Sequence, residues 1–307
     1  MLIQSQNKRV VAVHDLSCMG RVSLMAAVPI LSSMGLEVCP LPTALLSCHT
    51  QYPEFTFLDL TDEMKHIIAN WKSQGFRFNA FYTGYLGSPE QVQVVEDLIR
   101  DFRRPADLTV VDPVLGDNGK LYKGMKEEMV GQMRSLIQLA DVITPNMTEM
   151  FLLLGNNMDL YNEMVNGQSS MVNCQSSLDA KLKSYLRELS DKGPAIVIVT
   201  SVPVIGNPHL TSVYAYNRNG NRFWKVTCPF LPAHYPGTGD AFTSVITGSL
   251  MQGDSLPLAL DRAAQFTLQG IRSTFGYDYN NMEGIMLEKV LNNLTTPIQV
   301  SSYELID

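Results

Sequence analysis

The chain has 307 residues, of which 45% are hydrophobic and 17% are charged. This composition is that of a globular protein and excludes a disordered or fibrous chain. The net charge of −7 argues against nucleic acid or an anionic membrane surface as partner, because both need a basic face. No apolar run reaches the roughly 20 residues of a membrane helix, and the first residues predict no signal peptide. The five cysteines form no Cys-x-x-Cys pair, which favours a reducing compartment, so we expect a cytoplasmic protein.

Strands and helices are predicted to alternate along most of the chain. β-branched runs predict buried strands at 9–14, 36–41, 80–83, 108–112, 141–144 and 195–200. Periodicity, capping residues and stop signals predict helices at 21–34, 61–73 (with Thr61 as N-cap), 88–103, 126–139 and from 146 onward. This alternation is typical of βαβ units. We therefore predict an α/β fold of three layers (αβα), with a mostly parallel central sheet and helices on both faces.

Two segments interrupt the alternation. Residues 156–177 are rich in Asn, Gln, Ser and Met, and we interpret them as a surface insertion. Runs at 212–216 and 223–227, joined by Asn217-Arg218-Asn219-Gly220, predict an antiparallel hairpin. Three helices without a further parallel strand are expected after it. No linker divides the chain, so we expect residues 1–307 to form a single domain.

The strongest candidate for a site is Gly237-Thr238-Gly239-Asp240, which precedes a helical repeat. Glycines allow a tight turn, and free N–H groups at a helix N-terminus form an anion pocket. Asp240 would place a carboxylate beside that pocket, an arrangement that suits phosphoryl transfer. For the isolated motif, however, a plain turn followed by an ordinary first-turn acid is the commoner interpretation.

Three familiar nucleotide-binding patterns are absent from the sequence. There is no Gly-x-x-x-x-Gly-Lys-Ser/Thr loop, and no Gly-x-Gly-x-x-Gly follows the first strand. The His-Arg-Asp and Asp-Phe-Gly motifs of protein kinases are also missing. A P-loop or protein kinase is therefore excluded, and a Rossmann dinucleotide site is disfavoured.

Two further candidates follow predicted strands, where open α/β sheets bind ligands. Asp112 and Asp117 lie in the segment Val-Asp-Pro-Val-Leu-Gly-Asp, and one or both could reach Mg²⁺, although turn acids explain them equally well. Asn146 and Glu149 have the spacing of a capping box, which by itself explains that pair. Taken together, the three candidates supply a base, an anion pocket and magnesium ligands at one edge of the sheet.

The chain resembles the ribokinase-like superfamily and, within it, the pyridoxal (vitamin B6) kinases. The resemblance rests on seven stretches in family order: VVAVHDLSCMGRVSLMAAVPILSSMGLEV, LPTALLSCHTQY, YTGYLGSPEQ, VVDPVLGDNGKLY, DVITPNMTEMFLL, VIVTS and GTGDAFTS. It covers most of the chain. The second and third stretches point most sharply to the B6 kinases, whereas the Gly-x-Gly-Asp motif marks the superfamily.

The resemblance implies ATP-dependent phosphorylation of the 5′-hydroxymethyl group of pyridoxal, pyridoxine or pyridoxamine. Asp240 would accept the proton of that hydroxyl, while the backbone of Gly237, Thr238 and Gly239 would hold the transferred phosphoryl group. The nucleotide and its Mg²⁺ would be bound by Asp112, Asn146, Glu149, Thr200, Ser201 and Thr238, with Asp112 and Glu149 at the metal, partly through water. The vitamin pocket would be lined by Asp15, Ser47, His49, Thr50 and Tyr85. The segment 232–236 matches a nucleotide-side segment by position only.

The resemblance also implies a homodimer and a monovalent cation such as K⁺. Three residues depart from the B6 kinase pattern: Asp15 replaces a Ser, Cys48 an Asn, and Leu24 an Asn. We hypothesise that Asp15 pairs with a pyridinium nitrogen or favours an amine-bearing ring; an equally good interpretation is that it caps the next turn.

Two alternatives to a B6 kinase remain open. The first is a kinase of another small alcohol, such as hydroxymethylpyrimidine or a sugar. The second is a non-catalytic vitamin-binding or regulatory protein on the same scaffold. A zinc site is disfavoured because the five histidines have no metal-ligand spacing. Apart from His49, the histidines are expected to be ordinary polar or partly buried residues.

Overall fold

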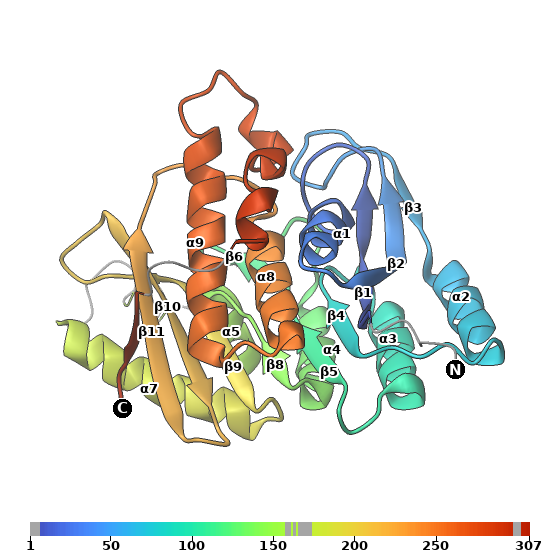
Figure 1. Ribbon diagram of the computed structural model, residues 1–307, viewed down its shortest axis with the longest axis horizontal. Helices are drawn as coiled ribbons and strands as arrows, with labels where there is room; N and C mark the ends of the chain where they lie inside the picture. Colours follow the sequence, from blue (N-terminus) through green and yellow to red (C-terminus); the bar gives the residue numbers. More distant parts are fainter. Residues whose placement is uncertain (1–6, 157–160, 162–163, 165–173, 297–301) are drawn as a thin grey trace.

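The computed structural model describes residues 7–156, 161, 164, 174–296 and 302–307. Its centre is a ten-stranded sheet in the order β12-β11-β10-β9-β8-β5-β4-β1-β2-β3 (Figure 1). The inner strands pair in parallel: β9 (Ile196–Pro203), β8 (Val142–Ile143), β5 (Leu108–Val111), β4 (Ala80–Thr83), β1 (Arg9–Ser17) and β2 (Glu37–Leu46). The mostly parallel sheet that the sequence predicts is confirmed.

The outer strands are antiparallel. β10 (Leu210–Asn217) and β11 (Arg222–Pro229) form the predicted hairpin, and β12 (Tyr303–Leu305) extends it at one edge. At the other edge, β3 (Phe57–Asp59) pairs with β2. A separate small hairpin consists of β6 (Gly116–Asp117) and β7 (Lys120–Leu121). The sequence predicted neither edge strand, because both are only three residues long and exposed, so they lack the long apolar run of a buried strand.

Helices cover both faces of the sheet, as predicted. One face carries α2 (Thr61–Ser73), α3 (Pro89–Phe102), α4 (Glu127–Leu136), α5 (Met147–Leu154) and α7 (Gln175–Asp191). The opposite face, toward the viewer in Figure 1, carries α1 (Leu24–Ser33), α8 (Thr238–Gln252) and α9 (Leu256–Thr274). Single turns of 3₁₀-helix lie at Ile137–Leu139, Asn281–Glu283, Leu287–Lys289 and Leu291–Leu294.

Alternating residues of the central strands enter two hydrophobic cores. On β1, Val11 and Val13 pack under the α2–α7 layer, whereas Val10 packs under α1, α8 and α9. On β4, Phe81 and Tyr82 divide between the two cores in the same way. Because both faces are buried, these strands are continuously apolar, which explains why the sequence indicated them so clearly.

Local signals predicted some helix ends correctly and others wrongly. Ser88 caps α3 by accepting a hydrogen bond from the N–H of Gln91, and Asn146 begins α5 in a complete capping box with Glu149. Thr61 was predicted as an N-cap, but it is the first residue of α2 and Leu60 precedes it as the cap. The first helix begins at Leu24 rather than at residue 21 because residues 20–23 form a turn. Among the described residues after the hairpin, two α-helices follow, and 3₁₀ turns stand in place of the expected third.

The predicted insertion at 156–177 lies largely outside the described residues. Its described part differs from a pure surface loop: Tyr161 and Met164 are buried in the core under α5 and α7, and α7 already begins at Gln175. Apolar residues within the polar composition therefore reach the core, which composition alone does not show.

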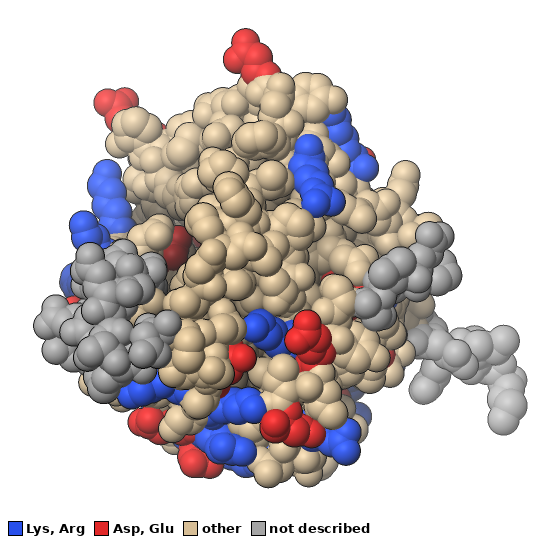
Figure 2. Space-filling model, turned by 90° about the vertical axis from the view of Figure 1, so that its left-hand side faces the viewer, with Lys and Arg blue, Asp and Glu red and all other residues tan. Residues whose placement is uncertain are grey.

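Charges are mixed on the face drawn in Figure 2. Basic and acidic side chains lie next to one another in its lower part, and its centre carries neither. Among the described residues, no helix is long and apolar enough to cross a membrane.

Candidate active site

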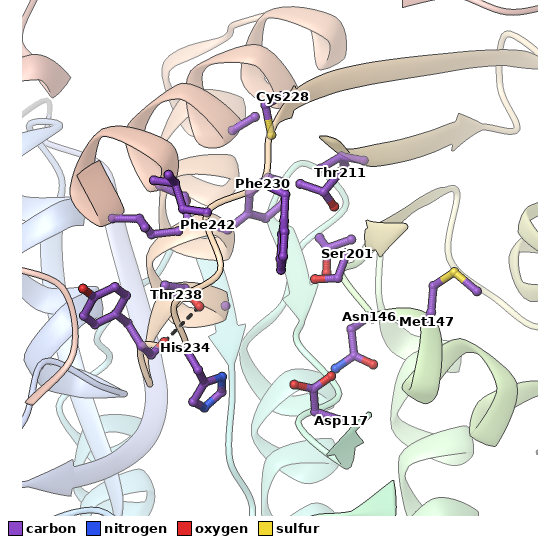
Figure 3. A pocket seen from close by; sticks show the side chains of 18 of the residues that line it. Asp117, Asn146, Met147, Ser201, Thr211, Cys228, Phe230, His234, Thr238 and Phe242 are labelled. Carbon is purple, nitrogen blue, oxygen red and sulfur yellow. Dashed lines mark hydrogen bonds between the residues drawn. The ribbon is translucent and has the colours of Figure 1, made fainter. Parts of the chain in front are cut away.

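A cavity of about 840 Å³ opens at the carboxyl ends of β5, β8 and β9, beside the N-terminus of α8 (Figure 3). Of the residues predicted for catalysis and nucleotide binding, all line this cavity: Asp112, Asn146, Glu149, Thr200, Ser201, Gly237, Thr238, Gly239 and Asp240. The segment 232–236, matched by position only, lines it too. Residues from four parts of the sequence thus meet where a doubly wound sheet binds its ligand.

The N-terminus of α8 forms one wall of the cavity. Gly237 is the N-cap with a φ of 83°, and a Cβ at this position would lie 2.1 Å from the carbonyl oxygen of Arg21. Only glycine fits this left-handed, crowded position. The first backbone hydrogen bond of the helix runs from Ala241 to Gly237, so the N–H groups of residues 238–240 have no partner within the helix. These N–H groups lie where the sequence predicts an anion pocket.

Asp240 lies in the first turn of α8 with its carboxylate held between elements. Its Oδ2 accepts a hydrogen bond of 2.9 Å from the backbone N–H of Ser23, and its Oδ1 lies 3.8 Å from Nδ1 of His14. Tyr82 donates its hydroxyl to the carbonyl oxygen of Asp240 across 3.3 Å. The Asp240 side chain is 15% exposed. Burial raises its pKa to about 7, and the charge of Asp15 adds to the increase.

Asp112 and Glu149 form a buried acidic pair at the ends of β5 and β8. Burial raises the pKa of Asp112 well above its ordinary value, and the charges of Glu149 and Asp240 raise it further. One oxygen of Asp112 accepts from the hydroxyl of Thr243 across 3.2 Å, and no side chain in the described part of the chain donates to the other. The backbone N–H of Val114 also donates to this carboxylate, and because each carboxylate oxygen has two lone pairs, Asp112 can still bind a cation.

Glu149 is bound mainly to backbone. Its Oε1 accepts from the N–H groups of Leu115 and Gly116, and its Oε2 accepts from the N–H of Asn146. Burial raises the pKa of Glu149 to about 7, although these backbone bonds oppose the increase. The capping box predicted for Asn146 and Glu149 is confirmed, and Glu149 additionally holds the loop that follows Asp112.

The remaining polar lining residues surround the same space. Asn146 donates its side-chain amide to the carbonyl of Gly116 across 2.8 Å, and it pairs with Thr200 in a parallel bridge. Figure 3 shows Asn146, Ser201 and Asp117 on one side of the cavity and Thr238 on the other. Among the described residues there is no cluster of three or more His, Cys, Asp or Glu that could hold a metal without other ligands.

The far part of the cavity is apolar. Phe230, which follows β11, and Phe242 on α8 lie in the upper part of Figure 3, with the Phe230 ring directed toward the middle. The other apolar lining residues there come from β10 and α9: Leu210, Val213, Ala264, Leu268 and Ile271. The cavity thus has an apolar end and a polar end, which suits a nucleotide with a flat base and a charged phosphate chain.

The residues predicted for the vitamin pocket lie outside this cavity, at the ends of β1, β2 and β4. Asp15 is 6% exposed and accepts hydrogen bonds from the hydroxyls of Ser17 and Ser23. Burial and the charge of Asp15 raise the pKa of Tyr85. His49 is buried and bonds to the carbonyl of Met282. Of these three residues, Asp15 is linked to Asp240, because Ser23 donates its hydroxyl to Asp15 and its backbone N–H to Asp240.

Ser47 and Thr50 are less well connected to that group. The Ser47 hydroxyl accepts from the N–H of Thr56 and lies 3.9 Å from the Cys48 sulfur. Thr50 is half-buried and has no hydrogen bond in the described part of the structure. Gln51, which the sequence did not single out, lines the cavity and lies 3.4 Å from His234.

Sequence reasoning missed three residues beside Asp240. Ser23 has no motif that marks it, His14 was interpreted as an ordinary histidine, and Tyr82 reads as a core aromatic in an apolar strand. Backbone strain marks the site as well: Ser23, Val114 and Ser201 have φ angles of 51°, 40° and 59°. Non-glycine residues rarely adopt such angles, and they concentrate at functional sites.

Comparison with known proteins gives consistent matches. The model of a family described as phosphomethylpyrimidine kinase matches residues 58–284. A Bacteroides thetaiotaomicron protein, provisionally described as a phosphomethylpyrimidine kinase and crystallised with pyridoxal, is 66% identical with a TM-score of 0.90, covering 98% of this chain and 100% of its own. The pyridoxal kinase of Lactobacillus plantarum is 31% identical with a TM-score of 0.81, covering 94% and 97%. The pyridoxine/pyridoxal/pyridoxamine kinase of Bordetella avium is 30% identical over 280 residues, which are 86% of this chain and 85% of that protein.

Proposed function

The chain belongs to the phosphomethylpyrimidine kinase family, and from this premise we propose that it transfers the γ-phosphate of ATP to the 5′-hydroxymethyl group of pyridoxal, pyridoxine or pyridoxamine. The observation that carries the proposal is the position of Asp240, a partly buried carboxylate beside the free N–H groups at the start of α8 and at the wall of the cavity. Relatives that match along most of the chain are named for kinases of these same vitamers. We take residues 1–307 as one kinase domain.

Asp240 acts as the general base in this proposal. Its pKa of about 7 leaves a large fraction ionised at neutral pH while keeping the carboxylate basic enough to accept a proton. As the hydroxyl oxygen attacks the γ-phosphorus, its proton passes to Asp240. The backbone N–H groups of Gly237, Thr238 and Gly239 stabilise the charge on the phosphoryl oxygens.

The cavity binds the nucleotide in two parts. Phe230, Val213 and Ile271 contact the base at the apolar end, while Asn146, Thr200, Ser201 and Thr238 face the phosphates at the polar end. This orientation directs the γ-phosphate toward the N-terminus of α8, where Asp240 lies. ATP is therefore the co-substrate that fits the length and polarity of the cavity.

The acidic pair fits a magnesium ion. Mg²⁺ prefers one or two carboxylates together with phosphate oxygens and water, and Asp112 has an oxygen that no described side chain occupies. Asp112 would bind the ion directly, whereas Glu149, already bound to three backbone N–H groups, would orient its water ligands. The ion would neutralise part of the negative charge on the phosphates.

The vitamin lies on the other side of Asp240. Asp15, His49 and Tyr85 border this space, and Tyr85 either stacks on the ring or closes over it, with Ser47 and Thr50 at the rim of the pocket. The pyridoxal bound in the crystals of the Bacteroides thetaiotaomicron relative supports a B6 vitamer as ligand. The substrate panel below tests whether this pocket binds a B6 vitamer.

One observation favours a second candidate substrate. The matching family is described by phosphomethylpyrimidine kinases, whose pyrimidine substrates also carry a hydroxymethyl or phosphomethyl group on a flat heterocycle. The fold and the chemistry at Asp240 would be unchanged. Hydroxymethylpyrimidine is therefore the alternative acceptor.

A coupled assay of ADP release tests the proposal. Purified protein is supplied with MgATP and, separately, with pyridoxal, pyridoxine, pyridoxamine, hydroxymethylpyrimidine and a sugar. We expect the largest kcat/KM with a B6 vitamer; a larger value with the pyrimidine would replace the substrate. Thermal stabilisation by a vitamer without any turnover would indicate a binding protein instead.

The same preparation tests the finer expectations. Omitting Mg²⁺ should abolish turnover. Exchanging K⁺ for Na⁺ should lower the rate if the enzyme uses K⁺ as its monovalent cation. Light scattering tests the homodimer. Cytoplasmic location requires cell fractionation, in which the protein should accompany the soluble fraction.

A further inference from the structure

His14 lies on β1, immediately before Asp15, and is completely buried. Its ring stands at 75° to that of Tyr82 on the neighbouring strand, with centroids 4.4 Å apart. The backbone of Gly84 approaches the same ring so closely that a Cβ at residue 84 would lie 2.2 Å from Nδ1. The imidazole is therefore held in one position by a shape that only a glycine at residue 84 permits.

Neither ring nitrogen of His14 has a hydrogen-bond partner in the described part of the structure. A buried polar atom left without a partner costs about 1–3 kcal/mol, and native proteins rarely carry one without a functional reason. Burial lowers the pKa of His14 to about 3, so the ring is neutral near neutral pH and one nitrogen carries a hydrogen.

Oδ1 of Asp240 lies 3.8 Å from Nδ1 of His14. A hydrogen bond would require the two atoms to approach by roughly 1 Å. Hydrogen bonds at catalytic groups are often long without substrate and shorten when it binds. The other oxygen, Oδ2, is already held by the N–H of Ser23.

We propose that His14 is a positioning residue whose Nδ1–H donates to Oδ1 of Asp240 when the alcohol substrate binds. With Ser23 on one oxygen and His14 on the other, the carboxylate is fixed in plane, and a remaining lone pair is directed at the substrate hydroxyl. His14 keeps its own hydrogen throughout, because the hydroxyl proton goes to Asp240. This inference rests on the proposed role of Asp240.

A matched pair of variants tests the proposal. Asn and Leu have nearly the same shape, but only Asn offers an N–H close to the position of Nδ1. We expect His14→Leu to lower kcat for pyridoxal about tenfold or more, the value of one hydrogen bond to a charged group. The KM values should stay within about twofold, since the bond matters in the transition state. His14→Asn should recover most of kcat.

Thr109→Val is the control for removing a buried polar atom. The Thr109 hydroxyl on β5 is also buried without a partner, and Thr109 is absent from the cavity lining. This variant should retain wild-type kcat, and melting curves establish that all three variants fold. Equal kcat values for the Leu and Asn variants would overturn the proposal. Absence of turnover in the wild-type protein would instead overturn the proposed function.

A second measurement uses the wild-type protein alone. With ¹⁵N-labelled histidine, the Nδ1–H resonance of His14 should move downfield when pyridoxal and a non-hydrolysable ATP analogue bind together. An unchanged resonance in the saturated complex would contradict the proposal, even where the Leu variant fails to fold.

Discussion

Ser23 joins Asp15 to Asp240: its hydroxyl donates to Oδ1 of Asp15, and its backbone N–H donates to Oδ2 of Asp240 across 2.9 Å. Ser23 adopts a φ of 51°, which is unfavourable for a residue with a side chain. The bond to Asp15 compensates for that strain. The position of the proposed base therefore depends on a turn in a distant part of the sequence.

This link predicts the effect of Asp15→Ser. Both oxygens of Asp15 accept bonds from serines, so we expect Asp15 to act through Ser23 rather than as a selector of the vitamin ring. The variant should lower kcat about 10- to 100-fold, as for a lost bond to a charged group, by the same factor for pyridoxal, pyridoxine and pyridoxamine. Steady-state kinetics with all three vitamers check this; a change in their ratios would assign Asp15 to ring recognition.

Phe230 is predicted to bind the nucleotide base. It is 49% exposed, yet its ring is directed into the cavity. Phe230→Ala should raise the KM for ATP about tenfold, as expected for loss of a stacking contact, while kcat at saturating ATP changes little. The control is Phe275→Ala, because Phe275 is 48% exposed but does not line the cavity. Equal KM values for the two variants would remove Phe230 from the nucleotide site.

The two glycines before Asp240 should differ in their tolerance of a side chain. A Cβ at Gly237 would strike the carbonyl of Arg21 in a left-handed backbone, whereas a Cβ at Gly239 has no heavy atom within 4 Å. We expect Gly237→Ala to reduce the free energy of unfolding by about 2–4 kcal/mol and Gly239→Ala to leave it nearly unchanged. Urea denaturation measures both, and similar losses would show that the crowding at Gly237 is relieved by movement.

The pKa of Asp240 predicts how activity depends on pH. The base must be ionised, and its pKa is about 7, so kcat/KM for the vitamer should rise with pH and level off above that value. The pKa of Glu149 is also about 7, which requires a control. Glu149→Gln should lower activity but leave the midpoint in place; a midpoint that disappears in this variant would assign the titration to Glu149.

The ionisation of Asp240 should also affect stability, in the opposite direction: the free energy of unfolding should fall over the pH range in which activity rises. The pKa of Asp240 is higher in the folded chain than its ordinary value of 3.8, so the folded state binds the proton more tightly. Its contribution to stability is therefore lost as pH rises from about 4 to about 7. Asp240→Asn removes the buried charge and should stabilise the protein by up to about 4 kcal/mol at pH 8 and by less at pH 5. A difference that is constant with pH would contradict this.

Much of the fold was predictable because its strands are buried on both faces. Val10 to Val13 on β1 and Ile196 to Val199 on β9 are continuous apolar runs. Such runs predict buried strands whichever helices pack against them. The edge strands β3 and β12 were missed because their residues are exposed and pair only through the backbone. The range of α2 was predicted correctly, but Thr61 was misassigned as its N-cap: its N–H is bound by the Asp59 side chain, and it is already the first helical residue.

The site was predictable where the chain carries a motif and not where it depends on contacts between distant segments. Asp240 and Asp112 follow a glycine turn and a strand end, so their place was readable from the sequence. His14 was not, because its importance arises only from its distance of 3.8 Å to Asp240. The spacing predicted the capping-box bond of Glu149 to Asn146, but not its two bonds to the N–H groups of Leu115 and Gly116, which hold the loop after Asp112.

The central claim is that Asp240 removes the proton of the substrate hydroxyl, and single-turnover phosphorylation of pyridoxal by Asp240→Asn tests it most directly. The side-chain amide keeps the shape and can still accept from Ser23, so ATP should bind as tightly as in the wild-type protein. The rate of phosphoryl transfer should fall by about 10²–10⁴. A rate within a few-fold of wild type, with ATP affinity unchanged, would contradict the account.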